Sequence, residues 1–418
     1  MQNHPADQEP RRVLGSFFTP KSQNTPTWEQ RKLGDAFERV VRKNTNNESR
    51  LPLTISAQDG LVDQITYFNN RVASRDVSNY YLVYNGEFAY NKSTSDGYPF
   101  GAVKRLDWYE KGVLSTLYIV FALKHPEKDD SDFMTVFYDT DRWHRGVAER
   151  AAEGARNHGL LNISADDFFD IDTTMPEDKV EQEKIGRLLK KLDTLITLHQ
   201  RKYEKLVNIK KSMLDKMFPQ NGASVPEIRF KGFTDPWEQR KVGTLIEDYT
   251  EKTVTQNQYP VLTSSQQQGI VLQEDYFADR QVTTDNNVGY YVLPKGYFTY
   301  RSRSDTDVFV FNRNNIVDKG IISYYYPVFA PKSCDSNFLL RRLNHGIKKQ
   351  LSMAAEGTGQ KVLAHAKFKN MVVDVPSQSE QEKIGTILEE LDTLITLHQR
   401  KLEKLQNIKK SCLEKMFV

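Results

Sequence analysis

Residues 181–218 read EQEKIGRLLKKLDTLITLHQRKYEKLVNIKKSMLDKMF, and residues 380–417 repeat them as EQEKIGTILEELDTLITLHQRKLEKLQNIKKSCLEKMF. Only eight of the 38 aligned positions differ. A repeat this close indicates a duplicated structural unit. The two copies predict two versions of one long helix, kept in a single chain for a geometric purpose.

Apolar residues recur along both copies with heptad spacing, which is typical of helices that pack against one another. Each helix is roughly 57 Å long at 1.5 Å per residue, and its obvious partner is the other copy. We therefore expect an antiparallel coiled coil with pseudo-two-fold symmetry. The predicted helix–helix seam consists of Ile185, Leu188, Leu192, Leu195, His199 and Leu206 in the first copy and Ile384, Ile387, Leu391, Leu394, His398 and Leu405 in the second.

His199 and His398 lie at the middle of their helices, so an antiparallel pair would bring them together near the crossing point. A metal ligand or proton shuttle is one interpretation, but two histidines without carboxylate or thiol neighbours make a poor metal site. A polar pair that fixes the register of the seam is favoured. No metal is expected.

The duplication extends outside the helices. WEQRKLG at residues 28–34 returns as WEQRKVG at 237–243, and GEFAY at 86–90 returns as GYFTY at 296–300. AAEG occurs at both 151–154 and 354–357. The offset between the copies drifts, so each half consists of a variable globular domain followed by a constant helix.

The variable domains contain short apolar and aromatic runs bounded by Gly, Asn, Asp and Pro, which predict strands. Gly86 and Gly296 are expected to turn tight hairpins, and Tyr90 and Tyr300 to lie in strand cores. The fold class is α+β, with two strand-rich mixed domains in tandem, each followed by a long helix. The expected segments are an extension over 1–24, a first domain over 25–178, a helix over 179–219, a linker over 220–233, a second domain over 234–378 and a helix over 379–418.

Composition predicts a folded, soluble, cytoplasmic protein. The 418 residues are 38% hydrophobic and 27% charged, with no long apolar run and no signal-peptide pattern at the start. Two cysteines, Cys334 and Cys412, cannot form a disulfide framework or a four-ligand zinc site. The acidic cluster Asp129, Asp130 and Asp132 is expected to decorate an exposed loop.

Catalytic motifs are missing from the sequence. It contains no P-loop, no dinucleotide-binding glycine motif, no H-E-x-x-H or C-x-x-C, and no nucleophile elbow. It also lacks Pro-Pro, and hence the tetrapeptide with which amino-methyltransferases grip a flipped base. We therefore expect a non-catalytic protein.

The order and spacing of these motifs resemble the specificity subunit of type I restriction-modification enzymes. The resemblance rests on the WEQRK(L/V)G entry, the EQEKIG exit into the LDTLI helix, and the segment VPEIRFKGF at 225–233. It implies that each variable domain is a target recognition domain that reads one half of a bipartite double-stranded DNA target. It also implies that the helices are conserved spacers that set the gap and bind two modification (methyltransferase) subunits, with two restriction (motor and nuclease) subunits where these are present. SAM, ATP and Mg would then belong to the partners, with no cofactor in this chain.

Net charge is only +3, which is low for a protein that binds DNA by neutralising phosphates. We expect local concentration of positive charge, with added attraction from the modification subunits. Candidate DNA-binding residues are polar side chains near the predicted hairpins and after the AAEG motif, each of which could equally be a solvated loop residue. They are Gln58, Asn91, Lys92, Ser93, Arg156 and Asn157 in the first domain and Gln266, Gln267, Arg301, Ser302, Arg303, Thr358, Gln360 and Lys361 in the second.

One pair of mismatches between the helices stands out. Lys190 and Lys191 of the first copy are replaced by Glu389 and Glu390 in the second. Solvated faces or contacts with a protein partner are the expected explanation. Three alternatives to the leading interpretation stay open: a coiled-coil scaffold that binds only proteins, a stand-alone DNA-binding protein without a restriction partner, and a methyltransferase or nuclease with fused recognition domains.

Overall fold

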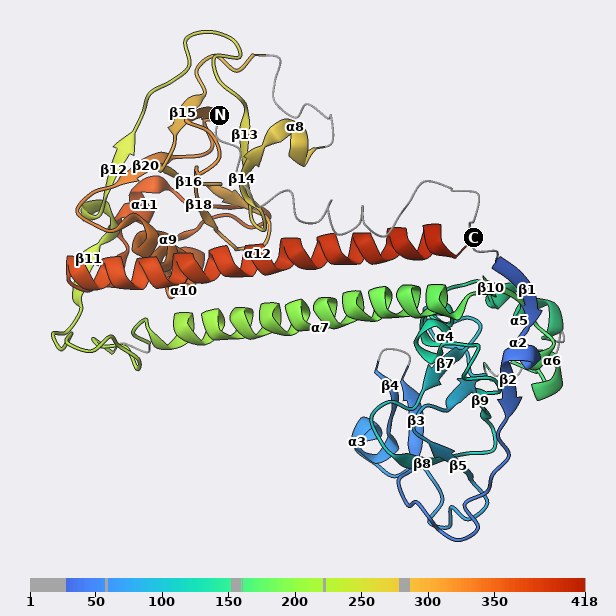
Figure 1. The fold of residues 1–418 in the computed structure, drawn as a ribbon. Coiled ribbons are helices and arrows are strands. Elements are labelled where there is room, and N and C mark those ends of the chain that lie inside the picture. The colour runs from blue at the N-terminus through green and yellow to red at the C-terminus, as the bar shows by residue number, and fades with distance from the viewer. Residues whose placement is uncertain are drawn as a thin grey trace. The chain divides into compact units, whose positions relative to one another are not determined.

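The computed structural model describes residues 28–56, 59–151, 159, 161–220, 223–277 and 286–417. The predicted extension at 1–24 therefore lies outside the described residues. The chain divides into two compact units, one made of Met1–Leu198 with Leu402–Val418 and the other of His199–Lys401 (Figure 1). Each unit thus combines one globular domain with parts of both long helices.

The first unit follows the predicted α+β class. Its elements are β1 (Trp28–Lys32), α2 (Leu33–Ala36), β2 (Phe37–Arg39), β3 (Leu53–Ser56), β4 (Gly60–Asp63), α3 (Gln64–Phe68), β5 (Tyr81–Tyr84), β6 (Phe88–Asn91), β7 (Ala102–Arg105), β8 (Lys111–Leu114), β9 (Ile119–Leu123), α4 (Ser131–Phe137), α5 (His144–Arg150), α6 (Ala165–Phe169), β10 (Asp172–Pro176) and the beginning of α7 (Lys179–Lys216).

The second unit repeats this order with two additional short strands, β17 and β21, and with a 3-10 turn in place of α2. It contains the remainder of α7, β11 (Glu238–Lys241), the 3-10 turn η2 (Val242–Thr244), β12 (Ile246–Tyr249), β13 (Leu262–Ser265), β14 (Gly269–Leu272), α8 (Gln273–Tyr276), β15 (Tyr291–Pro294), β16 (Phe298–Tyr300), β17 (Arg303–Ser304), β18 (Phe311–Arg313), β19 (Lys319–Ile322), β20 (Val328–Pro331), α9 (Ser336–Asn344), α10 (Lys348–Ala354), β21 (Lys361–Val362), α11 (His365–Asn370), β22 (Val372–Val375) and most of α12 (Gln378–Met416).

Each domain is built around a four-stranded antiparallel sheet, with the order β2-β9-β6-β7 in the first unit and β12-β20-β16-β18 in the second. Side chains alternate across it as a strand requires. In β6, Phe88 and Tyr90 face a core shared with the helices, whereas Ala89 faces a second core shared with β3, β5 and β8. Tyr90 and Tyr300 are fully buried, so their predicted place in the strand core is confirmed.

The hairpin prediction at the two glycines was wrong. Gly86 and Gly296 do turn the chain tightly, with φ of 87° and 84° that favour glycine. However, β5 pairs with β8 and β6 with β9, so the strands on either side of Gly86 belong to different sheets. The turn moves the chain from one layer of the domain to the next.

The beginning of α7 completes the core of the first domain. Ile185, Leu189 and Leu192 are buried in the same cluster as Phe133 and Phe137 of α4. Gly186 lies where a Cβ atom would come within 2.6 Å of the Phe133 backbone nitrogen, so only glycine allows α4 this close. In the second unit Ile384, Leu388 and Leu391 of α12 occupy the equivalent cluster with Phe338.

The end of each long helix packs on the globular domain that belongs to the other copy. Phe417, just after α12, lies in the core of the first unit, with its ring stacked on Phe133 at 5.5 Å and edge-on to Trp28 at 5.9 Å. In the second unit Phe218, after α7, meets Phe338 at 5.8 Å and Trp237 at 6.0 Å. The shared KMF sequence thus gives each domain an aromatic plug from the far end of the other helix.

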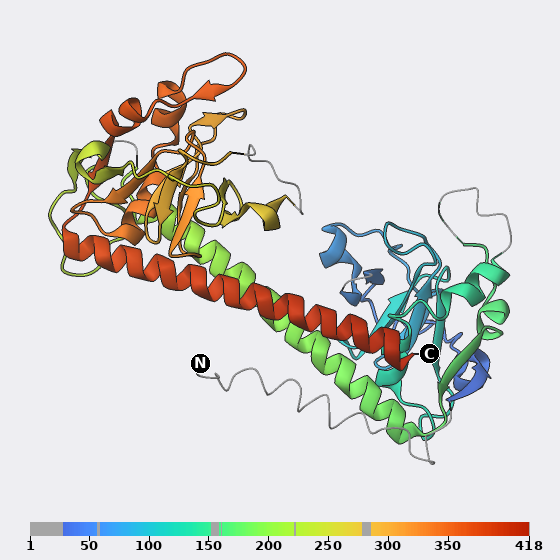
Figure 2. The same cartoon turned by 90° about the horizontal axis from the view of Figure 1, so that it is seen from above.

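The antiparallel arrangement is visible within the second unit. There the ribbons of α7 and α12 run in opposite directions (Figure 2). His199 lies next to His398, and further along α7 Lys210 pairs with Asp392, which comes earlier in α12. The two histidine Nδ1 atoms are 2.8 Å apart, so the predicted meeting of these residues is confirmed. In the first unit Lys409 donates to Asp193 at 2.5 Å.

The predicted seam residues differ in their burial. Ile185 and Leu192 lie in the core cluster of the first unit, which also contains Leu405 and Cys412 of α12, and Ile384 and Leu391 lie in that of the second unit, which also contains Leu206 of α7. Leu394 is 42% exposed. Leu188, Leu195, Ile387, Leu206 and Leu405 are half-buried, and the last three pack against the core clusters. Leu189 and Leu388, which are outside a two-stranded seam, are fully buried. Along the first turns of each helix, the heptad stripe packs in a core that contains residues of the globular domain and of the other long helix.

No helix in the described parts of the chain is long and apolar enough to cross a membrane.

Replacing Phe417 with Ala should destabilise the first unit, because it removes a ring that touches Trp28 and Phe133 and leaves a cavity. We expect a loss of about 3–5 kcal/mol in the free energy of unfolding of that unit. Leu397→Ala, at a 46% exposed position of the same helix, is the matched control. Hydrogen exchange should accelerate in α4 for the first variant only; equal protection in both would mean that the plug is dispensable.

The histidine pair should make stability sensitive to acid. Burial lowers the pKa of His199 below its ordinary 6.5, and the nearby His398, Lys401 and Lys202 lower it further. The folded chain therefore binds this proton less well than the unfolded chain, so stability is complete above pH 6.5 and falls as the pH drops below it. The Tm measured from pH 7.5 to 5.5 should fall less in the variant with His199→Asn and His398→Asn. Parallel curves would exclude the pair as the cause.

Candidate nucleic-acid interface

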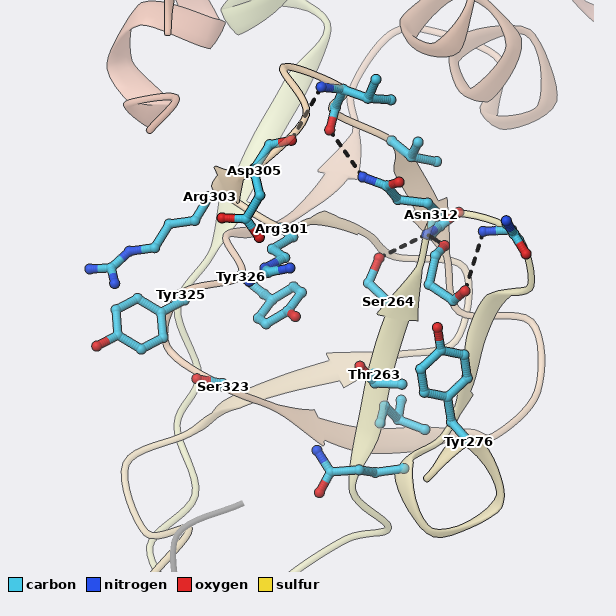
Figure 3. Close-up of a pocket in the computed structure, with 18 of the residues that line it drawn as sticks. Thr263, Ser264, Tyr276, Arg301, Arg303, Asp305, Asn312, Ser323, Tyr325 and Tyr326 are labelled. Carbon is cyan, nitrogen blue, oxygen red and sulfur yellow. Dashed lines mark hydrogen bonds between the residues drawn. The ribbon is translucent and has the colours of Figure 1, made fainter. Parts of the chain in front are cut away.

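A polar groove of about 770 Å³ lies in the second unit (Figure 3). Its walls come from β13, the residues after β16, the residue Asn312 of β18 and the loop Ser323–Tyr326. All of these segments leave or adjoin the central sheets, so a rigid frame positions a surface made largely of loops.

Asn312 ties two walls of the groove together. Its Nδ2 atom donates to the Ser264 hydroxyl and to the Ser265 carbonyl, both at 2.8 Å. Gln266, which follows β13, donates to the Val308 carbonyl at 3.3 Å. These bonds hold the tip of the β13–β14 hairpin against the segment after β17.

Two arginines provide the positive charge of the groove. Arg301 and Arg303 are exposed, and neither forms an ion pair with any residue that the structure describes. The guanidinium carbon of Arg303 lies 4.2 Å from the centre of the Tyr325 ring. This cation–π contact holds the side chain while leaving its N–H donors free for a ligand.

Tyrosines add aromatic surface and further donors. Burial raises the pKa of Tyr326. The hydrogen bond between Tyr324 and Tyr325 raises the pKa of Tyr324. Both phenols are therefore protonated at neutral pH. Tyr276 of α8 lies on the opposite wall (Figure 3).

One carboxylate, Asp305, also lines the groove. It accepts a hydrogen bond from the Gln360 side chain at 2.9 Å. Ser302 turns its hydroxyl to the Tyr325 carbonyl at 2.7 Å, which fixes the loop between the two arginines. The groove thus presents arginine, amide, hydroxyl and phenol groups on a braced backbone.

Five of the residues suggested by the sequence meet in this groove: Gln266, Gln267, Arg301, Arg303 and Gln360. Thr358 is exposed and Lys361 is half-buried in β21, and neither is among the lining residues. Sequence reasoning missed Asn312 and Tyr325. The run of three tyrosines at 324–326 was the available signal for Tyr325, whereas nothing in the sequence marked Asn312.

Of the first-unit candidates, the structure describes Asn91, Lys92 and Ser93. Asn91 ends β6 and accepts a hydrogen bond from the backbone of Ser93 at 3.0 Å. Lys92 is turned to the Ile163 carbonyl at 3.2 Å, which leaves it less available to a phosphate. Gln58, Arg156 and Asn157 lie outside the described residues.

The two units nevertheless use the same backbone frame at this place. The amide of Leu161 donates to the Lys92 carbonyl at 3.0 Å, and the amide of Leu363 donates to the Ser302 carbonyl at 2.9 Å. In both units the segment after the AAEG motif therefore returns beside the end of the central strand. The frame is shared, whereas the side chains that it presents differ.

Comparison with known proteins places the second module in a family. Residues 235–407 match the family model of the type I restriction modification DNA specificity domain. The domain is described as one of DNA specificity, which agrees with the expectation of a non-catalytic protein.

Similar architectures occur among solved structures. The type I restriction-modification system S subunit from M. genitalium is 14% identical, with a TM-score of 0.54, and the match covers 96% of this chain and 98% of that one. The HsdS subunit from Thermoanaerobacter tengcongensis is 15% identical with a TM-score of 0.40, over 94% and 97% of the two chains. A chain from a structure on complex assembly and conformational transition of the type I R-M system is 16% identical, with a TM-score of 0.41. The match covers 95% of this chain and 99% of that one.

The match of the family model falls on the module that contains the polar groove, and the first module repeats the elements of that module in the same order except for the short strands β17 and β21. Residues 235–407 are therefore a type I restriction modification DNA specificity domain, which confirms for this part of the chain the resemblance to type I specificity subunits.

Proposed function

We propose that this chain is the specificity subunit of a type I restriction-modification complex, in which each globular domain reads one half of a bipartite double-stranded DNA target. The observation that carries the proposal is the groove of the second unit, where Arg301, Arg303 and four glutamines converge. Arginine suits the O6 and N7 atoms of guanine, and glutamine suits the N6 and N7 atoms of adenine.

The structure of the groove supports base reading more than general attraction to phosphates. Its two arginines stand beside amides, hydroxyls and phenols, which carry hydrogen-bond patterns but no charge. The sequence between residues 228 and 379 has 19 basic and 15 acidic residues, so its net charge is small. Much of the nonspecific affinity then comes from partner subunits.

The two long helices are the proposed spacer and docking platform. They are the constant part of the chain, and two modification subunits would bind them, joined by two restriction subunits where the system has them. SAM, ATP and Mg would bind to those partner subunits. The complex would work in the cytoplasm, where the DNA is. This chain contributes the choice of sequence and the gap between half-sites.

A coiled-coil scaffold that binds only proteins is the main competitor, and a stand-alone DNA-binding protein is another. A scaffold that binds proteins through its coiled coil does not require the convergent arginine and amide side chains of the groove. Selection of random DNA by the chain with its modification subunits separates these functions. A scaffold would show no sequence preference, whereas a stand-alone reader would show one without the partners.

Replacing both Arg301 and Arg303 with Ala should weaken reading of one half-site only. Each bidentate arginine–guanine contact contributes about 1–3 kcal/mol to discrimination, so methylation at targets defined by that half-site should fall at least tenfold. The matched control is Lys295→Ala with Lys348→Ala, two exposed cations of the same unit outside the groove. Equal loss at both half-sites would contradict local reading.

Deleting one heptad from each helix, residues 194–200 and 393–399, should shorten the unread gap. Seven residues correspond to roughly 10 Å of helix, or about three base pairs. Both half-site sequences should survive in the methylation pattern. Replacing the same heptads by other helix-forming heptads of equal length is the control, and a gap that stays the same after deletion would refute the spacer role.

A further inference from the structure

We propose that each long helix carries a charge code, a set of charged residues that attract its own globular domain and would repel the other one. The code consists of three equivalent pairs of positions: Asp132 and Asn337, Val136 and Arg341, and Lys190 and Glu389. In the first unit the acid is on the domain and the base on the helix. In the second unit these charges are reversed.

The contacts of the first unit show one half of the code. Lys190 of α7 donates to the Asp132 carboxylate of α4 at 2.8 Å, and Arg105 of β7 donates to the same carboxylate at 2.9 Å. Burial alone would raise the pKa of Asp132, but the hydrogen bonds from Lys190 and Arg105 outweigh it and lower the pKa. Asp132 is therefore ionised between two cations.

The contacts of the second unit show the reverse. Arg341 of α9 pairs with Glu389 of α12 at 2.8 Å and with Asp392 at 2.5 Å. Arg313 of β18 lies 3.7 Å from the other Glu389 oxygen. Here the domain supplies two cations and the helix supplies the carboxylates.

The frame around these charges is the same in both units, so the charges occupy equivalent places. Gln182 of α7 accepts from the Asp130 amide at 2.8 Å, and Gln381 of α12 accepts from the Asp335 amide at 3.0 Å. Arg105 and Arg313 are likewise equivalent, since they bind Ser131 and Ser336 at 2.7 and 2.8 Å. The charges therefore differ while the docking geometry stays the same.

These contacts correct two expectations from the sequence. Lys190 and Glu389 each pair with their own domain, whereas Lys191 and Glu390 are exposed as expected. The acidic cluster does not decorate an exposed loop: Asp129 is 1% exposed and pairs with Arg31, and Asp130 caps α4 by accepting from the Phe133 amide at 2.7 Å.

Exchange of the domains would bring like charges together. The second domain on α7 would set Arg341 and Arg313 against Lys190. The first domain on α12 would set Asp132 against Glu389, with Val136 in the place of Arg341. Asp193 and Asp392 occupy the same position of the two helices, and Arg105 stays beside Asp132, so these groups do not distinguish the domains. Surface pairs are individually weak, but both exchanged interfaces would replace the pair at Lys190 or Glu389 by like charges, and Arg341 and Arg313 would lose Glu389 from positions that are only 13% and 10% exposed.

The code therefore fixes which domain occupies which half of the chain. Its consequence for DNA, a fixed order of the two half-sites, rests on the proposed function. The interface itself does not, because it can be tested by stability alone.

The experiment compares four full-length proteins. They are the natural chain, the chain with residues 28–176 and 237–376 exchanged, and each of these with Lys190→Glu and Glu389→Lys. We expect the helix substitutions to lower the Tm of the natural chain and to raise that of the exchanged chain, each by about 2–4 °C or more. Opposite signs in the two backgrounds are the signature of a code.

The same sign in both backgrounds would overturn the proposal. If the exchanged chain does not fold, the natural background still decides. Asp132→Lys and Lys190→Glu should each lower the Tm, and the double variant should recover most of the loss. A double variant as unstable as the sum of the two single variants would also overturn it.

Discussion

Each globular domain depends on aromatic packing against both long helices. In the first unit Phe133 of α4 receives Phe417 from the end of α12 and packs in one core with Leu189 from the beginning of α7. In the second unit Phe338 receives Phe218 and packs in one core with Leu388. Because both cores are completed by residues distant in sequence, neither domain has a full core without the helices. The nearly invariant helices are thus a structural requirement of two domains whose surfaces differ.

A shared frame with different side chains explains how one fold presents two different surfaces. The four-stranded sheet, the tight turns and the bonds to the Lys92 and Ser302 carbonyls recur in both units. The side chains at the exposed strand end do not recur: Asn91 stands where the second unit has Arg301. The exposed side chains can therefore differ without disturbing the core, while the proposed charge code of the helices favours each domain on its own helix.

Much of the fold could be predicted from the sequence, because the duplication and the 3.6-residue period are strong local signals. The two helices, their antiparallel pairing and the meeting of His199 with His398 are examples. The strand pairing around Gly86 could not be, since a tight turn does not specify which strands pair. The partners of Lys190 and Glu389 depend on α4 and α9, which are about 50 residues away in the chain, so no local pattern revealed them. Part of the groove could be predicted, because its charged and amide residues stand out in the sequence. Asn312 could not be predicted, because its role depends on β13 and β18 lying side by side in the fold.

The central claim is that this chain chooses the DNA sequence while its partners act on it. The most direct test is a genome-wide map of methylated positions in cells that contain the modification subunit, with this chain present or absent. The account predicts a single split motif, two short defined halves with a fixed unread gap, that appears only when the chain is present. Methylation of the same motif without the chain, or a continuous motif with no gap, would contradict it.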